Sequence, residues 1–217
     1  MRTFICLLLL LVASTAFSQT TERDTKSQDP PIYNDVSGTP YFIRDWSDGI
    51  IRFASGRNAS QFKIRFDCIN NKVLLQFNGS SFSTESKVKE FVLYTKNGKD
   101  RDSAVFKKGF PATEKANEET FYQVLLEGKN QLLCLHIKII SEEPQIASKV
   151  IYRRIRDEVK YFMLKDKNMI ELPADRQLLA DSFPDKYEEI RKFIAEQQLK
   201  FREAADFVKL LRFYNSL

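Results

Sequence analysis

Apolar and polar residues alternate along much of the chain between about Gly38 and Leu172. Gln61–Cys68 is the clearest example. Its apolar face consists of Phe62, Ile64, Phe66 and Cys68. Its polar face consists of Gln61, Lys63, Arg65 and Asp67. A period of two is the period of a β-strand, and this division is typical of a strand with one face buried. The pattern therefore predicts a half-buried antiparallel strand.

Seven further segments show a similar pattern. They are Gly49–Ala54, Lys72–Asn78, Val88–Thr95, Thr120–Glu127, Gln131–Ile140, Val159–Lys165 and Met169–Leu172. Short runs rich in Asn and Gly separate several of them, such as Asn78-Gly79 and Gly128-Lys129-Asn130. Asn and Gly tolerate the positive φ of tight hairpin turns, and short connections make neighbouring strands antiparallel.

After Pro173 the apolar spacing becomes helical. We expect a short helix over Ala174–Ser182, a second beginning at Pro184 and a last helix over Arg202–Tyr214. Their apolar stripes are Tyr187, Ile190 and Ile194, then Ala204, Phe207, Val208 and Leu211. Strands followed by helices predict an α+β fold. We expect one domain over residues 38–217, with an antiparallel sheet or meander, barrel-like or sandwich, in 38–172 and two to three packed helices in 173–217.

Residues 1–18 have the features of a signal peptide. Arg2 precedes the apolar stretch Phe4–Val12, and Ala16-Phe17-Ser18 is a small-x-small cleavage site. We expect cleavage before Gln19, a secreted or periplasmic location, and no transmembrane segment in the mature chain. Residues 19–37 are polar and predict a flexible tether.

Cleavage would remove one of the three cysteines and leave Cys68 and Cys134. An exported protein can form a disulfide. Strand phase argues against one here, because Cys68 shares the apolar face of its strand whereas Cys134 lies opposite the cleanest apolar face of its own. Free buried thiols are the favoured interpretation.

His136 is the only histidine, and it shares a strand face with Cys134 and Lys138. An imidazole that activates a thiol would be a catalytic pair. Same-face neighbours on a strand are about 7 Å apart, however, so a partly exposed surface histidine is favoured.

Few other residues indicate chemistry. The sequence has no HExxH, CxxC, GxGxxG or GxSxG motif. The carboxylate pairs Glu118-Glu119 and Glu142-Glu143 fall in predicted loops or strand edges, and Asp45 with Asp48-Gly49 is only a fragment of a calcium loop. We assign no catalytic, cofactor-binding or metal residue and expect no cofactor.

The charge is mildly basic, with a net formal charge of +5 and a pI near 9.0. The basic clusters are Lys107-Lys108 and Arg153-Arg154 with Arg156, but acidic residues are interleaved with them. This distribution favours a solvated basic face over a nucleic-acid partner. Attraction to an anionic envelope surface stays open.

Aromatic residues gather near the start of the predicted domain: Tyr41, Phe42, Trp46 and Phe53. The only Trp lies beside turn residues in Asp45-Trp46-Ser47-Asp48-Gly49. Packing at the edge of the sheet is the favoured interpretation. Recognition of a carbohydrate or peptide is the alternative.

Three motifs occur in order: Gly38-Thr39-Pro40-Tyr41-Phe42 leading to Trp46 and Gly49, Phe121–Leu126 followed by Gly128-Lys129, and Phe213-Tyr214-Asn215. Together they resemble a family of uncharacterised secreted proteins of Bacteroidota-type Gram-negative bacteria, over about Gly38 to Leu217. The resemblance implies a periplasmic or cell-envelope protein. It implies no activity and no site residues.

Three functions remain open. The first is a non-enzymatic envelope module that binds a protein, peptide or glycan through its sheet. The second is an envelope-glycan hydrolase that uses carboxylates alone, for which two Asp or Glu suffice. The third is a structural or assembly factor that docks through its C-terminal helices, which an exposed stripe on Tyr187, Ile190 and Ile194, or on Val208 and Leu211, would favour.

Overall fold

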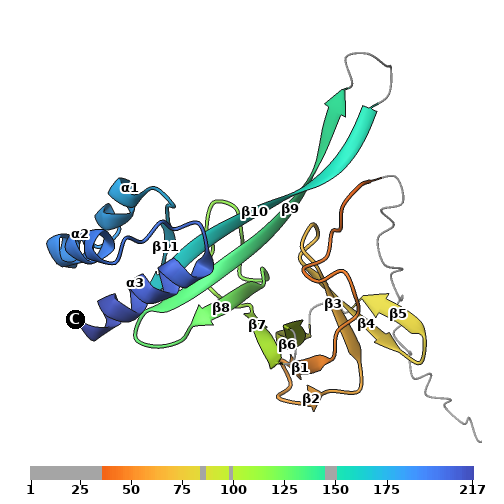
Figure 1. The fold of residues 1–217 in the computed structure, drawn as a ribbon. Helices are drawn as coiled ribbons and strands as arrows, with labels where there is room; N and C mark the ends of the chain where they lie inside the picture. Colours follow the sequence, from red (N-terminus) through yellow and green to blue (C-terminus); the bar gives the residue numbers. More distant parts are fainter. Residues whose placement is uncertain (1–35, 84–86, 98–99, 145–150) are drawn as a thin grey trace, which may run out of the picture.

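The computed structural model describes residues 36–83, 87–97, 100–144 and 151–217. It has the predicted α+β architecture: a long antiparallel sheet, a small second sheet and a group of C-terminal helices (Figure 1). Residues 1–18, the predicted signal peptide, lie outside the described residues, as does most of the predicted tether. Ser37, at its end, pairs in parallel with β10, since its N–H donates to Arg153 O and its C=O accepts from Ile155 N.

The large sheet has eight strands in the described chain, ordered β11-β10-β9-β8-β7-β6-β1-β2. Its strands are β1 (Gly49–Phe53), β2 (Asn58–Ala59), β6 (Val88–Asn97), β7 (Asp100–Lys107), β8 (Tyr122–Leu126), β9 (Gln131–Pro144), β10 (Ile151–Lys165) and β11 (Asn168–Leu172). All paired strands are antiparallel, and β6 to β11 form a meander in chain order. The sheet is open rather than closed into a barrel.

The small sheet contains β3 (Lys63–Asp67), β4 (Lys72–Phe77) and β5 (Ser80–Ser83). Its buried side chains share one core with β1, β6 and β7 of the large sheet. Phe66 lies 5.2 Å from Phe91 and 5.0 Å from Phe106 between ring centroids, and Phe91 and Phe106 stack at 4.8 Å. The two sheets therefore pack face to face in this half of the molecule, as a partial sandwich.

β9 and β10 form an antiparallel hairpin that is longer than predicted. Its register runs from the Gln131–Leu164 pair to the Pro144–Ile151 pair, and its distal half projects away from the sheet (Figure 1). The prediction of a strand starting at Val159 was wrong because the stretch before it is mostly charged and exposed. An alternating pattern appears in a sequence only where one face of a strand is buried.

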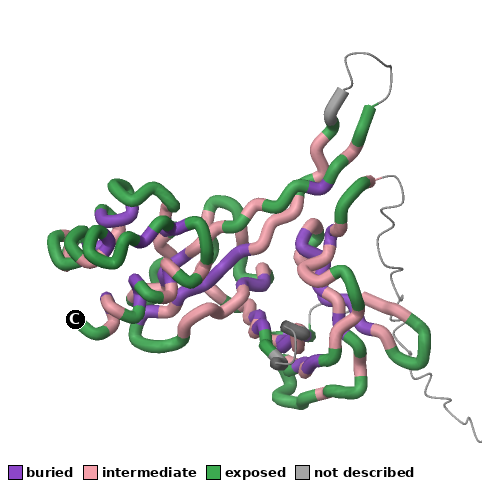
Figure 2. Tube along the Cα trace, viewed as in Figure 1, coloured by how far each residue is buried: buried purple, intermediate pink, exposed green. Residues whose placement is uncertain are grey.

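The helical end comprises α1 (Arg176–Asp181), a single 3₁₀ turn η1 (Pro184–Lys186), α2 (Tyr187–Glu196) and α3 (Ala204–Ser216). Buried side chains of these helices form one core with Leu132, Met163 and Leu172 of the sheet. Buried stretches occur along the helical end (Figure 2), and Ile190 and Leu211 are fully buried in that core. The apolar stripes that would favour docking to another protein thus pack mainly against this chain's own sheet.

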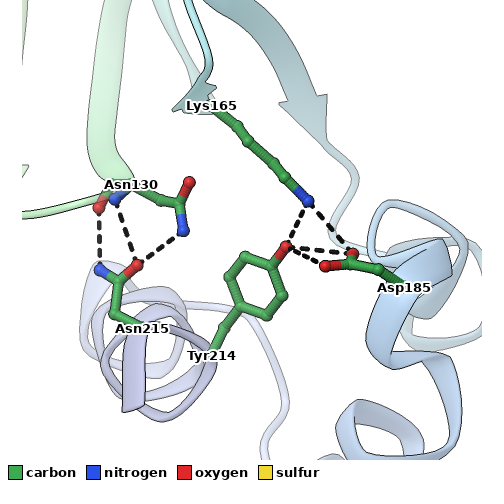
Figure 3. Close-up of polar contacts among 5 residues, drawn as sticks. All are labelled: Asn130, Lys165, Asp185, Tyr214 and Asn215. Carbon is green, nitrogen blue, oxygen red and sulfur yellow. Dashed lines mark hydrogen bonds and ion pairs between the residues drawn. The ribbon is translucent and has the colours of Figure 1, made fainter. Parts of the chain in front are cut away.

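Two polar contacts at the C-terminal end of α3 join it to distant parts of the chain (Figure 3). In the first, the Asn215 side chain is hydrogen-bonded to Asn130 in the β8–β9 turn. In the second, the Tyr214 hydroxyl donates to the Asp185 carboxylate and accepts from Lys165 Nζ at 2.5 Å. Burial opposes ionisation of Asp185, but the hydrogen bonds from Tyr214 and Lys165 outweigh it, so the pKa of this carboxyl is lowered. These contacts fix α3 against both the sheet and the η1 turn.

In the part of the chain that the structure describes, every helix is too short or too polar to span a bilayer.

Candidate functional site

The segment that contains the only tryptophan lines a pocket of about 500 Å³. It lies beside the chain between Ile43 and Asp48, with β3 and β6 as its other walls. Its lining residues are Ile43, Asp45, Trp46, Ser47, Asp48, Lys63, Tyr94 and Thr95. The structure thus places the Trp46 segment at a concave polar and aromatic surface.

Backbone hydrogen bonds hold this segment between the two sheets. Ser47 and Ile64 exchange both backbone hydrogen bonds, at 3.0 and 2.8 Å, which ties the segment to β3. On the other side, Tyr94 N donates to Asp48 O at 2.9 Å, which ties it to β6. The pocket therefore rests on regular strands rather than on a free loop, which favours a preformed site.

Arg65 holds the aromatic side chains beside the pocket. Its guanidinium lies 4.5 Å from the Tyr41 ring centroid and 4.4 Å from that of Trp46. Such cation–π contacts stabilise a ring by about 0.5–1 kcal/mol at exposed sites and by more where the cation is desolvated. Because Arg65 Nε is buried, this cation is partly desolvated, which strengthens its contact with the Trp46 ring.

The polar groups of the pocket are suited to hydrogen bonding. Lys63 Nζ donates to Asp48 Oδ1 at 2.7 Å, and both side chains are about half exposed. Asp45 is exposed, and Ser47 and Thr95 add hydroxyl groups. The sequence interpretation named Trp46, Asp45 and Asp48 but missed Lys63, Tyr94 and Thr95. The alternation of Gln61–Cys68, which puts Lys63 on the polar face, was the available signal for Lys63.

His136 lies in a different place, in edge-to-face contact with the Phe42 ring, with 4.7 Å between centroids and an interplanar angle of 68°. It is partly buried, and its Nε2 is 2.7 Å from Gln123 Oε1 and 3.4 Å from Cys134 Sγ. The prediction that His136 and Cys134 lie too far apart to touch was wrong. Strand spacing sets the separation of backbones, but a histidine side chain is long enough to reach its same-face neighbour.

This contact does not make a reactive pair. Because the Gln123 carbonyl oxygen only accepts hydrogen bonds, His136 Nε2 carries the proton and cannot accept another from the Cys134 thiol. Burial, with a smaller effect of Lys138, lowers the pKa of His136 to about 4, so the ring is neutral at pH 7. The His136 imidazole therefore acts neither as a general acid at neutral pH nor as a general base toward the Cys134 thiol.

Cys68 and Cys134, the cysteines of the described residues, are both free and buried. Burial raises the pKa of Cys68 and of Cys134 to about 12 in each case. Only the thiolate is a strong nucleophile or metal ligand, so these thiols are inert at neutral pH. Their place in the structure agrees with the interpretation of free buried thiols.

One carboxylate of each candidate pair has a basic partner. Glu119 accepts from Lys108 Nζ at 2.5 Å, and Glu142 lies 3.6 Å from Arg153 Nε. The fully buried carboxylate of the described chain, Asp67, accepts hydrogen bonds from the N–H groups of Ile69 and Asn70 and from the Asn70 side chain. Asp67 therefore stabilises the β3–β4 turn.

The described residues contain no cluster of three or more His, Cys, Asp or Glu side chains arranged to hold a metal ion. In the Asp45–Gly49 turn, Asp48 pairs with Lys63, a cation that competes with calcium for that carboxylate. The calcium interpretation of this turn therefore gains no support.

No family model, no curated protein and no solved structure matches this chain.

Proposed function

We propose that this protein is an exported, non-catalytic binding protein of the cell envelope, and that its pocket around Trp46 binds a neutral glycan. One observation carries the proposal: a partly exposed Trp and a Tyr line the same concave surface as two carboxylates, an ammonium and two hydroxyls. Ligand sites commonly combine aromatic side chains with a few polar groups that fix the ligand's orientation.

A sugar ring suits both parts of this lining. Its C–H face is apolar and packs on an aromatic ring, while its hydroxyls donate to carboxylates and accept from ammonium groups. Trp and Tyr combine a large apolar ring system with one polar atom, which suits a ligand that stays partly solvated when bound. The Arg65 contact restrains Trp46 before any ligand arrives, so less conformational entropy is lost on binding.

The charges of the pocket favour a neutral ligand. Asp45 and Asp48 in the lining are balanced by Lys63 and by the Arg65 guanidinium, which lies 4.4 Å from the Trp46 ring centroid. The pocket therefore offers no excess charge to an ionic ligand, whereas the hydroxyls of a neutral sugar would find both acceptors and donors.

Hydrolysis of a glycan is the less favoured alternative. A general acid needs a pKa raised by burial, and the second carboxylate acts across the scissile bond. Asp45 is exposed, and Asp48 is exposed over more than half of its side chain and paired with Lys63. Neither carboxylate is in the desolvated environment that a general acid requires.

The test uses the intrinsic fluorescence of Trp46, because the single tryptophan of the chain reports on this pocket alone. The purified protein is titrated with chitotetraose, cellotetraose and mannotetraose. We expect a saturable change in emission with at least one of them, and a binding constant at least ten-fold weaker in Asp48→Asn. Lys192→Ala on α2 should bind as the unaltered protein does.

The absence of a saturable response to all three oligosaccharides would contradict the proposal that the Trp46 pocket binds a neutral glycan. Release of reducing ends during the incubation would favour the hydrolase instead.

Mass spectrometry of the exported protein tests the proposed export. We expect a chain that begins at Gln19, and an uncleaved chain retained in the cytoplasm would contradict export.

A further inference from the structure

The segment that contains Trp46 continues the small sheet beyond β3. Ser47 and Ile64 form an antiparallel bridge. In an antiparallel pair, the next residue of one strand lies opposite the preceding residue of the other, so Asp48 lies opposite Lys63. Their contact, with Lys63 Nζ 2.7 Å from Asp48 Oδ1, agrees with this register. The pocket therefore shares Lys63 with one face of the small sheet.

Register identifies the residues beside Lys63 on that face. Gln76 of β4 lies opposite Lys63, and Ser81 of β5 lies opposite Gln76. Residues directly opposite each other share a face, so the three side chains form one row across β3, β4 and β5. Their neighbours in the chain, Ile64 and Leu75, point to the other face and are buried in the core between the sheets. Lys63, Gln76 and Ser81 thus lie on the outer face and are called the polar row below.

The polar row is accessible to a ligand. Lys63 is exposed, and Gln76 and Ser81 are partly exposed. Leu74, two residues before Gln76 and on the same face, is by contrast fully buried. Adjacent strands are about 4.8 Å apart, so the polar row spans about 10 Å. A ligand that leaves the pocket past Lys63 therefore meets Gln76 next and Ser81 after it.

The groups of the polar row are suited to the hydroxyls of a sugar. The Gln76 amide both donates and accepts hydrogen bonds, and so does the Ser81 hydroxyl. The Lys63 ammonium has three donors, of which the hydrogen bond to Asp48 uses one. Because Gln76 and Ser81 are uncharged, they add no preference for an ionic ligand to that of the pocket.

From this arrangement we propose that the polar row is a second subsite for the same glycan, and that the ligand is a linear oligosaccharide longer than a disaccharide. The inference rests on the proposed function of the Trp46 pocket. One sugar residue packs on Trp46, and the residues that follow it lie over Gln76 and Ser81. The row's length of about 10 Å is comparable with that of two linked pyranose rings.

The experiment compares ligands of two lengths. The fluorescence of Trp46 is followed during titration with chitobiose and chitotetraose, cellobiose and cellotetraose, and mannobiose and mannotetraose. In a series that binds, we expect the tetrasaccharide to bind about ten-fold more tightly than the disaccharide, because it alone reaches the polar row. Gln76→Ala should weaken binding of the tetrasaccharide about five-fold and leave binding of the disaccharide unchanged. Gln197→Ala, at the exposed end of α2, is the matched control and should alter neither.

Ser81→Ala tests the far end of the polar row. It should weaken binding of the tetrasaccharide about three-fold, and it decides the question if Gln76→Ala, in the middle strand, does not fold. Circular dichroism melting establishes that each variant is folded.

The second subsite and the Trp46 pocket can fail separately. Equal affinities for the two lengths, or losses in the polar-row variants that are the same for both lengths, would overturn the second subsite and leave the pocket in place. If neither length binds in any of the three series, the proposed function fails, and the second subsite fails with it.

Discussion

Asn215 on α3 makes three hydrogen bonds with Asn130 in the β8–β9 turn. Its Oδ1 accepts from Asn130 N at 3.2 Å and from Asn130 Nδ2 at 2.8 Å, and its Nδ2 donates to Asn130 O at 2.9 Å (Figure 3). Asn130 is one of the few buried polar residues of the described chain. The two residues are 85 positions apart in the sequence, so this contact ties the helical end to the sheet.

Replacing Asn215 with Ala should therefore destabilise the protein. The substitution leaves the buried polar groups of Asn130 without partners, and each such group costs about 1–3 kcal/mol. We expect the free energy of unfolding to fall by about 2–4 kcal/mol in urea titrations, and hydrogen exchange to become faster in α3. Asn168→Ala, at the exposed first position of β11, is the control and should change stability by less than about 1 kcal/mol. Equal effects of the two substitutions would contradict this role.

The sequence predicts the elements that bury one face. Gln61–Cys68 alternates cleanly because Ile64 and Phe66 enter the core between the sheets while Lys63 faces solvent. β7 was not predicted because it begins with three charged residues, Asp100, Arg101 and Asp102. Its buried residues, Ala104 and Phe106, follow only later, so its sequence shows too short an alternation. β2 and β5 were missed too, since strands of two and four residues are too short to show a period.

The candidate site was only partly predictable. Trp46 could be singled out because it is unique and lies beside turn residues. Tyr94 and Thr95 come from β6, and their approach to Trp46 depends on pairing between segments that are far apart in the chain. The contact between His136 and Cys134 was misjudged for a related reason, since side-chain reach cannot be read from strand spacing.

The partial burial of His136 predicts a pH dependence of stability. The pKa of this group is about 4 in the folded chain and 6.5 in the unfolded one, so between these values the unfolded chain binds a proton that the folded chain does not. Stability should fall as the pH is lowered from about 6.5 to 4, and this residue should contribute up to about 3 kcal/mol of the loss.

His136→Gln removes the titrating group and is the comparison. The difference in unfolding free energy between the two proteins should change across pH 6.5 to 4 and stay constant between pH 7 and 8. Proton NMR gives an independent measurement, because the single histidine has one set of ring signals, which should complete only about a tenth of their titration shift between pH 7 and 5. A midpoint near 6.5 would mean that the ring is solvated.

The two buried thiols should be unreactive in the folded protein. Because the pKa of both Cys68 and Cys134 is about 12, less than about one thiol in a thousand is ionised at pH 8, and the sulfurs are also covered. A chain lacking residues 1–18 should show no mass shift after brief exposure to iodoacetamide at pH 8, and two additions after unfolding without a reductant. A single rapid addition in the native state would identify an accessible thiolate, and no addition after unfolding would identify a disulfide.

Gly49 is required by the close approach of β1 to β6 behind the Trp46 pocket. A Cβ at this position would lie 2.0 Å from Val92 O and 2.8 Å from Ile64 Cδ1, and the first neighbour is backbone of a central strand. Gly49→Ala should therefore reduce the free energy of unfolding by more than about 3 kcal/mol, or prevent folding, because strands in a packed sheet can separate only at the cost of their core.

Gly56→Ala distinguishes this steric effect from the general cost of replacing a glycine. Gly56 has φ +83°, so alanine is strained there, but its Cβ would meet open space. The expected loss is about 1–2 kcal/mol. Urea unfolding of both variants, followed by the Trp46 emission, gives the comparison. If Gly49→Ala were no more destabilising than Gly56→Ala, the strands that frame the pocket would have to be less closely packed than the structure has them.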